Sequence, residues 1–122
     1  MTPETLLFCC SHGADDAERA TVPLIAAATA IASGQPAVVV CTIDAVWLGT
    51  EGYAEDVEVD GMPPASDLLR QIAAGGGEIW LCSACTTVRG ITGDDPRIAG
   101  ATIVGAARIV EALTRGRAIT LA

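Results

Sequence analysis

The sequence predicts an α/β fold in which helices cover both faces of a mostly parallel sheet. Short apolar segments alternate along the chain with longer segments of helical pattern. The apolar segments are continuous, which is typical of strands that are buried on both faces. Parallel strands that are joined through helices form right-handed crossovers. We expect a single domain over residues 1–122, because the chain is too short for two.

Four segments are expected to form strands. The first, residues 5–10 (TLLFCC), is an apolar run that the polar segment SHG ends. The second, residues 37–42 (AVVVCT), is apolar and β-branched, as buried strands usually are. The third and fourth are residues 78–82 (EIWLC) and 117–121 (RAITL).

An alanine-rich helix is expected between the first two strands. It begins near Asp15 and Asp16, whose charges suit a helix N-terminus, and it ends at Ser33. Pro23 complicates this helix, because proline lacks an N–H group and clashes with the preceding turn. The proline must either lie in the first turn, with Thr21 as the cap, or kink the helix.

The rest of the chain carries further helical patterns and one irregular segment. Residues 49–64 are acidic and contain several glycines and prolines, so we interpret them as a surface excursion. Ser66 is expected to cap the helix that follows it. The expected helices cover residues 43–48, 67–74, 83–89 and 100–113.

The charged residues exclude several functions. The chain carries 15 acidic and 7 basic residues, for a net charge of −8, and every basic residue is arginine. Without lysine there is no Schiff base, no pyridoxal phosphate anchor and no Walker phosphate loop. The acidic balance argues against nucleic-acid binding, and one histidine cannot build a multi-histidine metal site. We therefore expect no nucleic-acid partner, no metal and no organic cofactor.

Five cysteines are the unusual feature of the composition. The first residues carry no signal-peptide pattern, and the longest apolar-rich stretch, residues 22–32, is too short to span a bilayer. We therefore expect a cytoplasmic protein without membrane contact, in which thiols stay reduced. Cys9, Cys10 and Cys41 lie within the buried-strand patterns, so we interpret them as core residues.

Polar and reactive residues follow three of the expected strands. They lie in segments 11–15, 42–44 and 82–89. In open parallel sheets, ligands and reactive groups lie at the carboxyl ends of the strands. These three segments are therefore the candidate functional site.

Cys82 is the strongest candidate for chemistry, because it ends a strand and opens a helix. Unpaired N–H groups and the positive end of a helix favour a thiolate, the form that attacks sulfur electrophiles. Cys85 completes a Cys-x-x-Cys pattern as a neighbour or a resolving thiol, and Arg89 adds positive charge if the turn folds back. A zinc site, a thioredoxin-like dithiol and simple packing are alternatives. A second ligand pair is absent, however, and Trp80 stands one position too early for a thioredoxin-like motif.

His12 is the only histidine and follows the first strand. It is a candidate to hydrogen-bond or deprotonate a thiol across the carboxyl edge, or simply to satisfy backbone groups of its loop. Between Arg19 and Arg70 lie seven acidic residues and no basic one. We interpret these acids as a solvated face, with a docking surface or a lid beside the thiol as the alternative.

Three segments resemble DsrE-like proteins of the DsrE/DsrF sulfur-relay superfamily. Residues 7–23 (LFCCSHGADDAERATVP) resemble the opening of these proteins. Residues 52–57 (GYAEDV) are similar to a segment of a small subfamily that is loosely labelled peroxiredoxin-like. Residues 81–91 (LCSACTTVRGI) look like the cysteine loop of the superfamily, with Arg-Gly seven and eight residues after the cysteine. The resemblance covers nearly the whole chain.

This resemblance implies a three-layer α/β/α sandwich with a mostly parallel five-stranded sheet. It also implies a homo-oligomer, commonly a trimer or a hexamer. In the sulfur-transferring members, a cysteine aligned with Cys82 carries sulfur as a persulfide and passes it to a partner protein. Cys85 matches the Cys-x-x-Cys of the small subfamily.

Two functional hypotheses follow. The first is a sulfurtransferase-like sulfur carrier that accepts sulfane sulfur as a persulfide on Cys82, with Cys85, Arg89 and His12 as further site residues and with sulfur donor and acceptor proteins as partners. The second is a non-catalytic oligomeric binding or redox-sensing module, in which the thiols are structural or sense oxidants.

Overall fold

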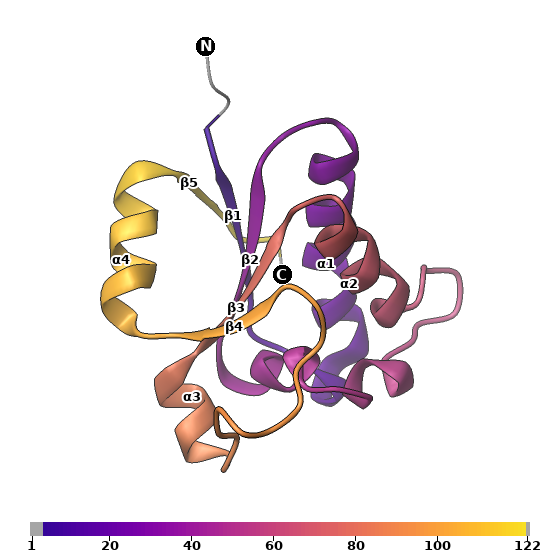
Figure 1. Ribbon diagram of the computed structural model, residues 1–122. Helices are drawn as coiled ribbons and strands as arrows, with labels where there is room; N and C mark the ends of the chain where they lie inside the picture. Colours follow the sequence, from indigo (N-terminus) through magenta and orange to yellow (C-terminus); the bar gives the residue numbers. More distant parts are fainter. Residues whose placement is uncertain (1–3, 122) are drawn as a thin grey trace.

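The computed structural model describes residues 4–121 and has the α/β architecture that the sequence predicts. Its strands are β1 (Leu6–Cys10), β2 (Ala37–Cys41), β3 (Glu78–Cys82), β4 (Ala101–Val104) and β5 (Arg117–Ile119). They form one sheet in the order β4-β3-β2-β1-β5, and every neighbouring pair is parallel. All five carboxyl ends therefore meet at one edge of the sheet, the lower edge in Figure 1.

Helices cover both faces of this sheet, which makes the fold a three-layer α/β/α sandwich (Figure 1). α1 (Ala17–Ala32) and α2 (Ala65–Ala74) lie over one face, and α4 (Ala106–Arg115) lies over the other. From β1 to β4, each new strand joins the sheet on the same side of the preceding one, whereas β5 pairs with the opposite side of β1. Right-handed crossovers in opposite directions place their helices on opposite faces, which explains the position of α4.

Shorter helices lie at the carboxyl edge and beside it. α3 (Ser83–Val88) follows β3 without a loop and lies below the sheet in Figure 1. Three 3₁₀ helices complete the fold, namely η1 (Ala14–Asp16), η2 (Ile43–Gly49) and η3 (Tyr53–Asp56).

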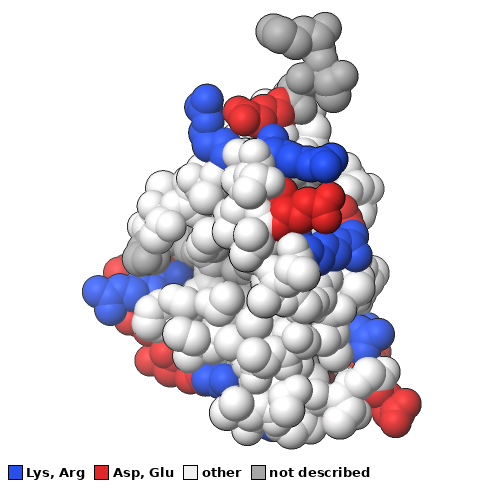
Figure 2. Space-filling model, turned by 90° about the vertical axis from the view of Figure 1, so that its left-hand side faces the viewer, with Lys and Arg blue, Asp and Glu red and all other residues white. Residues whose placement is uncertain are grey.

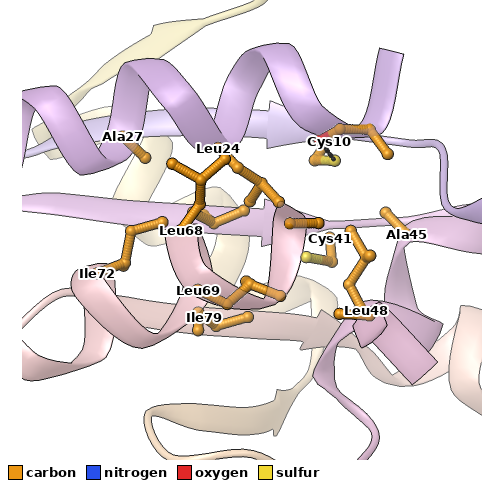
Figure 3. Close-up of a cluster of buried hydrophobic side chains, with 14 of the residues drawn as sticks. Cys10, Leu24, Ala27, Cys41, Ala45, Leu48, Leu68, Leu69, Ile72 and Ile79 are labelled. Carbon is orange, nitrogen blue, oxygen red and sulfur yellow. Dashed lines mark hydrogen bonds between the residues drawn. The ribbon is translucent and has the colours of Figure 1, made fainter. Parts of the chain in front are cut away.

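The larger part of the core lies between the sheet and α1 and α2. Figure 3 shows Leu24 of α1 and Leu68 of α2 pointing toward each other, with Cys10 and Cys41 of the same cluster beside them. These two cysteines face each other in the β1–β2 register and are almost completely buried, as predicted. Cys9 has the opposite orientation in β1 and is only half-buried.

The opposite face of the sheet is covered by α4. The apolar residues of this face of the sheet include Leu7, Trp80 and Val104, and Ile109 of α4 packs against them. The guanidinium of Arg108 lies over the Trp80 ring, 4.8 Å from the ring centre, in a cation–π contact.

The outer surface of α4 carries exposed apolar side chains beside the charged residues Arg108, Glu111 and Arg115. Val110 and Leu113 are exposed there, one helical turn apart. Figure 2 shows this side of the molecule, with a broad uncharged area in its central and lower part and charged side chains across its upper part and along its margins. No helix within residues 4–121 is long and apolar enough to cross a membrane.

The helix predicted over residues 100–113 is wrong in its first part. Residues Ala101–Val104 form β4, and the helix begins only at Ala106, after Gly105. Ile103 and Val104 stand at positions that fit both a helical and a strand pattern, and a short apolar run cannot separate the two. Pairing with β3 decides the conformation in favour of the strand.

Pro23 does not lie in the first turn of α1, and Thr21 is not its cap. The cap is Asp16, whose carboxylate accepts a hydrogen bond from the backbone N–H of Arg19 at 3.1 Å. Thr21 lies inside the helix and donates its hydroxyl to the carbonyl of Ala17 at 2.7 Å. Pro23 is an internal residue of α1, so the helix loses one backbone hydrogen bond there.

The acidic segment 49–64 is less superficial than expected. Ala54 and Val57 are buried in the core, and η3 gives the segment regular structure. Ser66 lies inside α2, whose N-cap residue is Pro64, so Ser66 is not the predicted cap.

Candidate functional site

Cys82 lies at the carboxyl edge of the sheet, in the connection from β3 to α3. It is the last residue of β3 and the N-cap residue of α3. Its neighbour in the sheet is Val104 of β4, and its side chain is half-buried. Because no loop separates the strand from the helix, the thiol is held between two regular elements.

The surroundings of Cys82 favour its thiolate. Partial burial raises the pKa of Cys82, but three donors against its sulfur together lower that pKa below the ordinary value of 9.0. These donors are the backbone N–H of Cys85, the thiol of Cys85 and the backbone N–H of Ala84. The Cys82 side chain makes no capping hydrogen bond to α3. α3 has six residues, so we attribute the effect to these local donors and not to the helix as a whole.

Cys85 lies one turn after Cys82 and is half-buried. Its side chain packs partly against the core, and its thiol is one of the groups that lower the pKa of Cys82. Residues three apart at the start of a helix have side chains about 5–6 Å apart at Cβ, and their Cα atoms fall in the range that a disulfide can bridge. The structure thus brings together two of the residues that the sequence singled out.

Arg89 folds back toward α3, as the sequence suggested, but its charge is paired. Its Nε and Nη2 donate to the same carboxylate oxygen of Asp44 at 2.9 and 2.8 Å. Its Nη1 donates to the backbone carbonyl of Cys85 at 3.2 Å. Arg89 therefore fastens α3 to η2, and the carboxylate of Asp44 neutralises most of the charge that it brings.

His12 makes its contacts with Asp15. The ring Nδ1 lies 2.9 Å from the Asp15 carboxylate, and this hydrogen bond is the main reason why the pKa of Asp15 is lowered from 3.8. The second oxygen of Asp15 accepts a hydrogen bond from the backbone N–H of Gly13 at 2.7 Å. β2 lies between the strand of His12 and that of Cys82, which places the two strands about 10 Å apart. The contacts of His12 therefore run within its own loop.

Two residues of the edge had no predicted role. Asp44 follows the second strand, in a segment that the carboxyl-edge rule selects, but nothing in the sequence indicates its partner Arg89. Tyr53 lies in the acidic segment, and its hydroxyl accepts a hydrogen bond from the backbone N–H of Ala14 at 2.8 Å. Gly13 lies between them, since a Cβ there would lie 2.8 Å from both the Asp44 carbonyl and the Tyr53 hydroxyl.

Exposed apolar side chains flank the thiol pair. Val88, at the end of α3, is 82% exposed, and Ile43, at the start of η2, is 54% exposed. Ile43 also has a φ of +54°, in the left-handed region that β-branched residues rarely adopt. Strained residues of this kind are enriched at functional sites, where the strain is retained for a reason other than stability.

The core cysteines are chemically different from Cys82. Burial raises the pKa of Cys10 to about 11, although a backbone hydrogen bond with His12 opposes this in part. Burial likewise raises the pKa of Cys41 well above 9.0. Among residues 4–121, no three His, Cys, Asp or Glu side chains gather closely enough to hold a metal ion.

The pockets of the surface lie away from the thiols. One, of about 420 Å³, lies between α2 and residues 98–100, with Leu69 and Arg70 in its wall. A second, also about 420 Å³, is lined by Trp47 and Ile91. Neither Cys82 nor Cys85 lines either pocket, so the thiol pair does not share an enclosed cavity with them.

Comparisons with known proteins agree with this fold. The family model for the DsrE/DsrF-like family matches residues 4–121. The crystal structure of the YchN protein from E. coli is similar, with a TM-score of 0.80 and 20% sequence identity over 98% of this chain and 100% of that one. The protein of unknown function MTH1491 from Methanobacterium thermoautotrophicum has a TM-score of 0.74 and 20% identity over 97% and 99% of the two chains. None of the curated proteins matches the chain.

Proposed function

We propose that this protein, which belongs to the DsrE/DsrF-like family, is a sulfur carrier that holds sulfane sulfur as a persulfide on Cys82. The observation that carries this proposal is the position of Cys82, which ends β3, is the N-cap residue of α3 and is half-buried. The backbone N–H groups of Ala84 and Cys85 and the thiol of Cys85 also lower the pKa of Cys82. These donors favour the thiolate, which is the nucleophile in reactions with sulfur electrophiles. Half-burial at the carboxyl edge leaves the same sulfur accessible to a donor.

The proposed reaction is two sulfur transfers. The thiolate of Cys82 attacks the outer sulfur of a donor persulfide, and a new S–S bond forms while the donor leaves as a thiolate. An acceptor thiolate then attacks the outer sulfur of the Cys82 persulfide, and Cys82 leaves as a thiolate in turn. A thiol of lowered pKa is a good leaving group, so the same N–H groups assist the second step.

Arg89 acts in this scheme as a positioning residue and not as the anion-binding group that we first expected. It holds the Cys85 carbonyl and the Asp44 carboxylate together, and so fixes the first turn of α3 on which the donors to Cys82 lie. The contacts of His12 with Asp15 support no step of the transfer.

The surroundings of the thiol suit protein partners. Val88 and Ile43 are large, exposed and apolar, and they belong to elements that flank Cys82. We therefore propose that sulfur donor and acceptor proteins dock over α3 and the start of η2. We also propose a homo-oligomer, a trimer or a hexamer as the family resemblance implies, with the exposed Val110 and Leu113 of α4 at its interface. Val110→Glu should then lower the mass measured by light scattering, whereas Val88→Glu should not.

The experiment that tests sulfur carriage is intact mass spectrometry after incubation with a sulfane-sulfur donor. The wild type and Cys85→Ser should gain one sulfur atom at an early time point, about 32 Da, whereas Cys82→Ser should gain none. Cys9→Ser is the matched control, because Cys9 is also half-buried, and it should gain sulfur normally. The proposal fails if no adduct forms, or if the adduct persists in Cys82→Ser.

The second candidate function is a redox-sensing module. The observation that favours it is the spacing of Cys82 and Cys85, which are three residues apart in one turn and both half-buried, so that a mild oxidant can join them. Ready formation of a Cys82–Cys85 disulfide with a mild oxidant favours redox sensing over sulfur carriage. Iodoacetamide reactivity measured against pH separates both of these functions from a purely structural thiol. Sulfur carriage requires fast alkylation of Cys82 near neutral pH, whereas a structural thiol reacts only near its ordinary pKa of 9.0.

A further inference from the structure

The position of Cys85 gives the site a group that a simple sulfur carrier does not need. A carrier requires one thiol that takes up the sulfur and gives it away. Here a second cysteine follows three residues after the first, in the first turn of α3, and both side chains are half-buried and hence reachable from solvent. The other three cysteines lie within strands β1 and β2 and not in this turn.

We propose that Cys85 resolves the Cys82 persulfide and releases its outer sulfur as sulfide, which makes the protein a persulfide reductase for small or protein-bound sulfane sulfur. This inference rests on the proposed uptake of sulfur by Cys82. Resolution requires that Cys85 attack Sγ of Cys82, which is the inner sulfur of the persulfide and belongs to the same turn. An attack on the outer sulfur would only move the persulfide from one cysteine to the other.

The step balances without any further reagent. Cys85 gives up its proton, and its sulfur forms a bond with Sγ of Cys82. The bond between Sγ and the outer sulfur breaks, and the outer sulfur leaves with the electron pair as HS⁻, which takes up the proton as H₂S. The sulfane sulfur is reduced by two electrons, and the two cysteine sulfurs are oxidised to a disulfide. A dithiol reductant then returns the pair to two thiols for the next cycle.

The local geometry allows this disulfide to form with little movement. Cys82 is the N-cap residue and Cys85 lies three residues later, at a spacing that brings side chains to the same side of the turn. The carbonyl of Cys85 stays bonded to Arg89, which is itself fixed by Asp44, so the backbone of the turn is held while the side chains react.

The test is a single-turnover experiment with the purified full chain and glutathione persulfide, without added reductant. The wild type should release about one sulfide per chain and lose about 2 Da relative to the reduced protein, with a Cys82–Cys85 disulfide in the peptide map. In Cys85→Ser the persulfide should persist about tenfold longer or more, because the intramolecular nucleophile is gone. Cys85→Ala repeats the test with a side chain that packs differently, and Cys9→Ser should behave like the wild type.

The outcomes separate this inference from the proposed function. If the wild type keeps its persulfide as long as Cys85→Ser and releases no sulfide, resolution by Cys85 is refuted while sulfur carriage stands. If neither the wild type nor Cys85→Ser takes up sulfur, sulfur carriage itself is refuted, and the inference falls with it.

Discussion

The ion pair between Asp44 and Arg89 should make a measurable contribution to stability, and Asp44→Asn tests it. Arg89 is 19% exposed and Asp44 38%, so the pair is neither a surface pair nor a fully buried one. Surface pairs contribute roughly 0.2–1 kcal/mol, whereas breaking a buried pair costs roughly 3–5 kcal/mol. Asparagine can still accept one hydrogen bond from Arg89 but cannot neutralise the guanidinium. We therefore expect the free energy of unfolding to fall by about 1–2 kcal/mol.

Thermal and urea unfolding measure this loss. For a chain of this size, about 1–2 kcal/mol corresponds to a decrease in Tm of roughly 3–10 °C. A double-mutant cycle with Arg89→Met isolates the interaction, and the coupling energy should be about 1 kcal/mol. The pair Arg115 and Glu111 is the control, because its atoms lie 3.6 Å apart and both side chains are largely exposed. Glu111→Gln should cost less than about 0.5 kcal/mol.

The cycle also provides the result that would refute the reasoning. If the effects of Asp44→Asn and Arg89→Met are simply additive, the two side chains do not stabilise each other. α3 would then be held by its apolar contacts alone, and Arg89 would lose its role as the residue that positions the turn of Cys85.

Three further predictions follow from burial and backbone geometry. Burial raises the pKa of Cys10 from 9.0 to about 11. The stability linked to the neutral Cys10 thiol is therefore complete below pH 9 and is lost as the pH rises to 11. The loss amounts to at most about 2–3 kcal/mol. Urea midpoints measured between pH 8 and 11 should therefore fall less steeply in Cys10→Ala than in the wild type. Equal slopes would contradict this prediction. Gly13→Ala should destabilise the protein by roughly 1–3 kcal/mol in urea unfolding, because its Cβ would lie 2.8 Å from the Asp44 carbonyl, whereas Gly93→Ala, which meets open space, should be nearly neutral. Ile43→Gly should increase the free energy of unfolding by about 0.5–1 kcal/mol, since it relieves the positive φ at an exposed position, and a decrease would show that the strain is offset by packing.

The parts of the fold that the sequence predicts are those with one dominant local signal. β2 is buried at every position, and a run such as AVVVC has no other reasonable interpretation. β4 lies at the edge of the sheet, and its four residues continue directly into a helix through Gly105. A helical period extended backward over these residues fits the sequence equally well. Only the pairing with β3, which is a long-range contact, selects the strand.

The candidate site likewise combines features that the local sequence predicts with features that depend on long-range contacts. The thiols of Cys82 and Cys85 are neighbours along the chain, so their proximity could be predicted from spacing. The pairing of Arg89 with Asp44 joins residues 45 positions apart, and no local pattern reports it. The pairing reverses the role that we first gave to Arg89, because a guanidinium beside a carboxylate is a structural tie and not a free positive charge.

The position of β5 has a consequence for the synthesis of the protein. β1 hydrogen-bonds β2 on one side and β5 on the other, and β5 is the last of the five strands along the chain. While the chain emerges from the ribosome, β1 to β4 can pair in order, but the outer side of β1 keeps its free N–H and C=O groups. Such an edge is a template for pairing with another chain. Residues Arg117–Ile119 pair with this edge of β1. A product truncated before residue 117 should therefore aggregate, even though it contains the complete turn of Cys82 and Cys85.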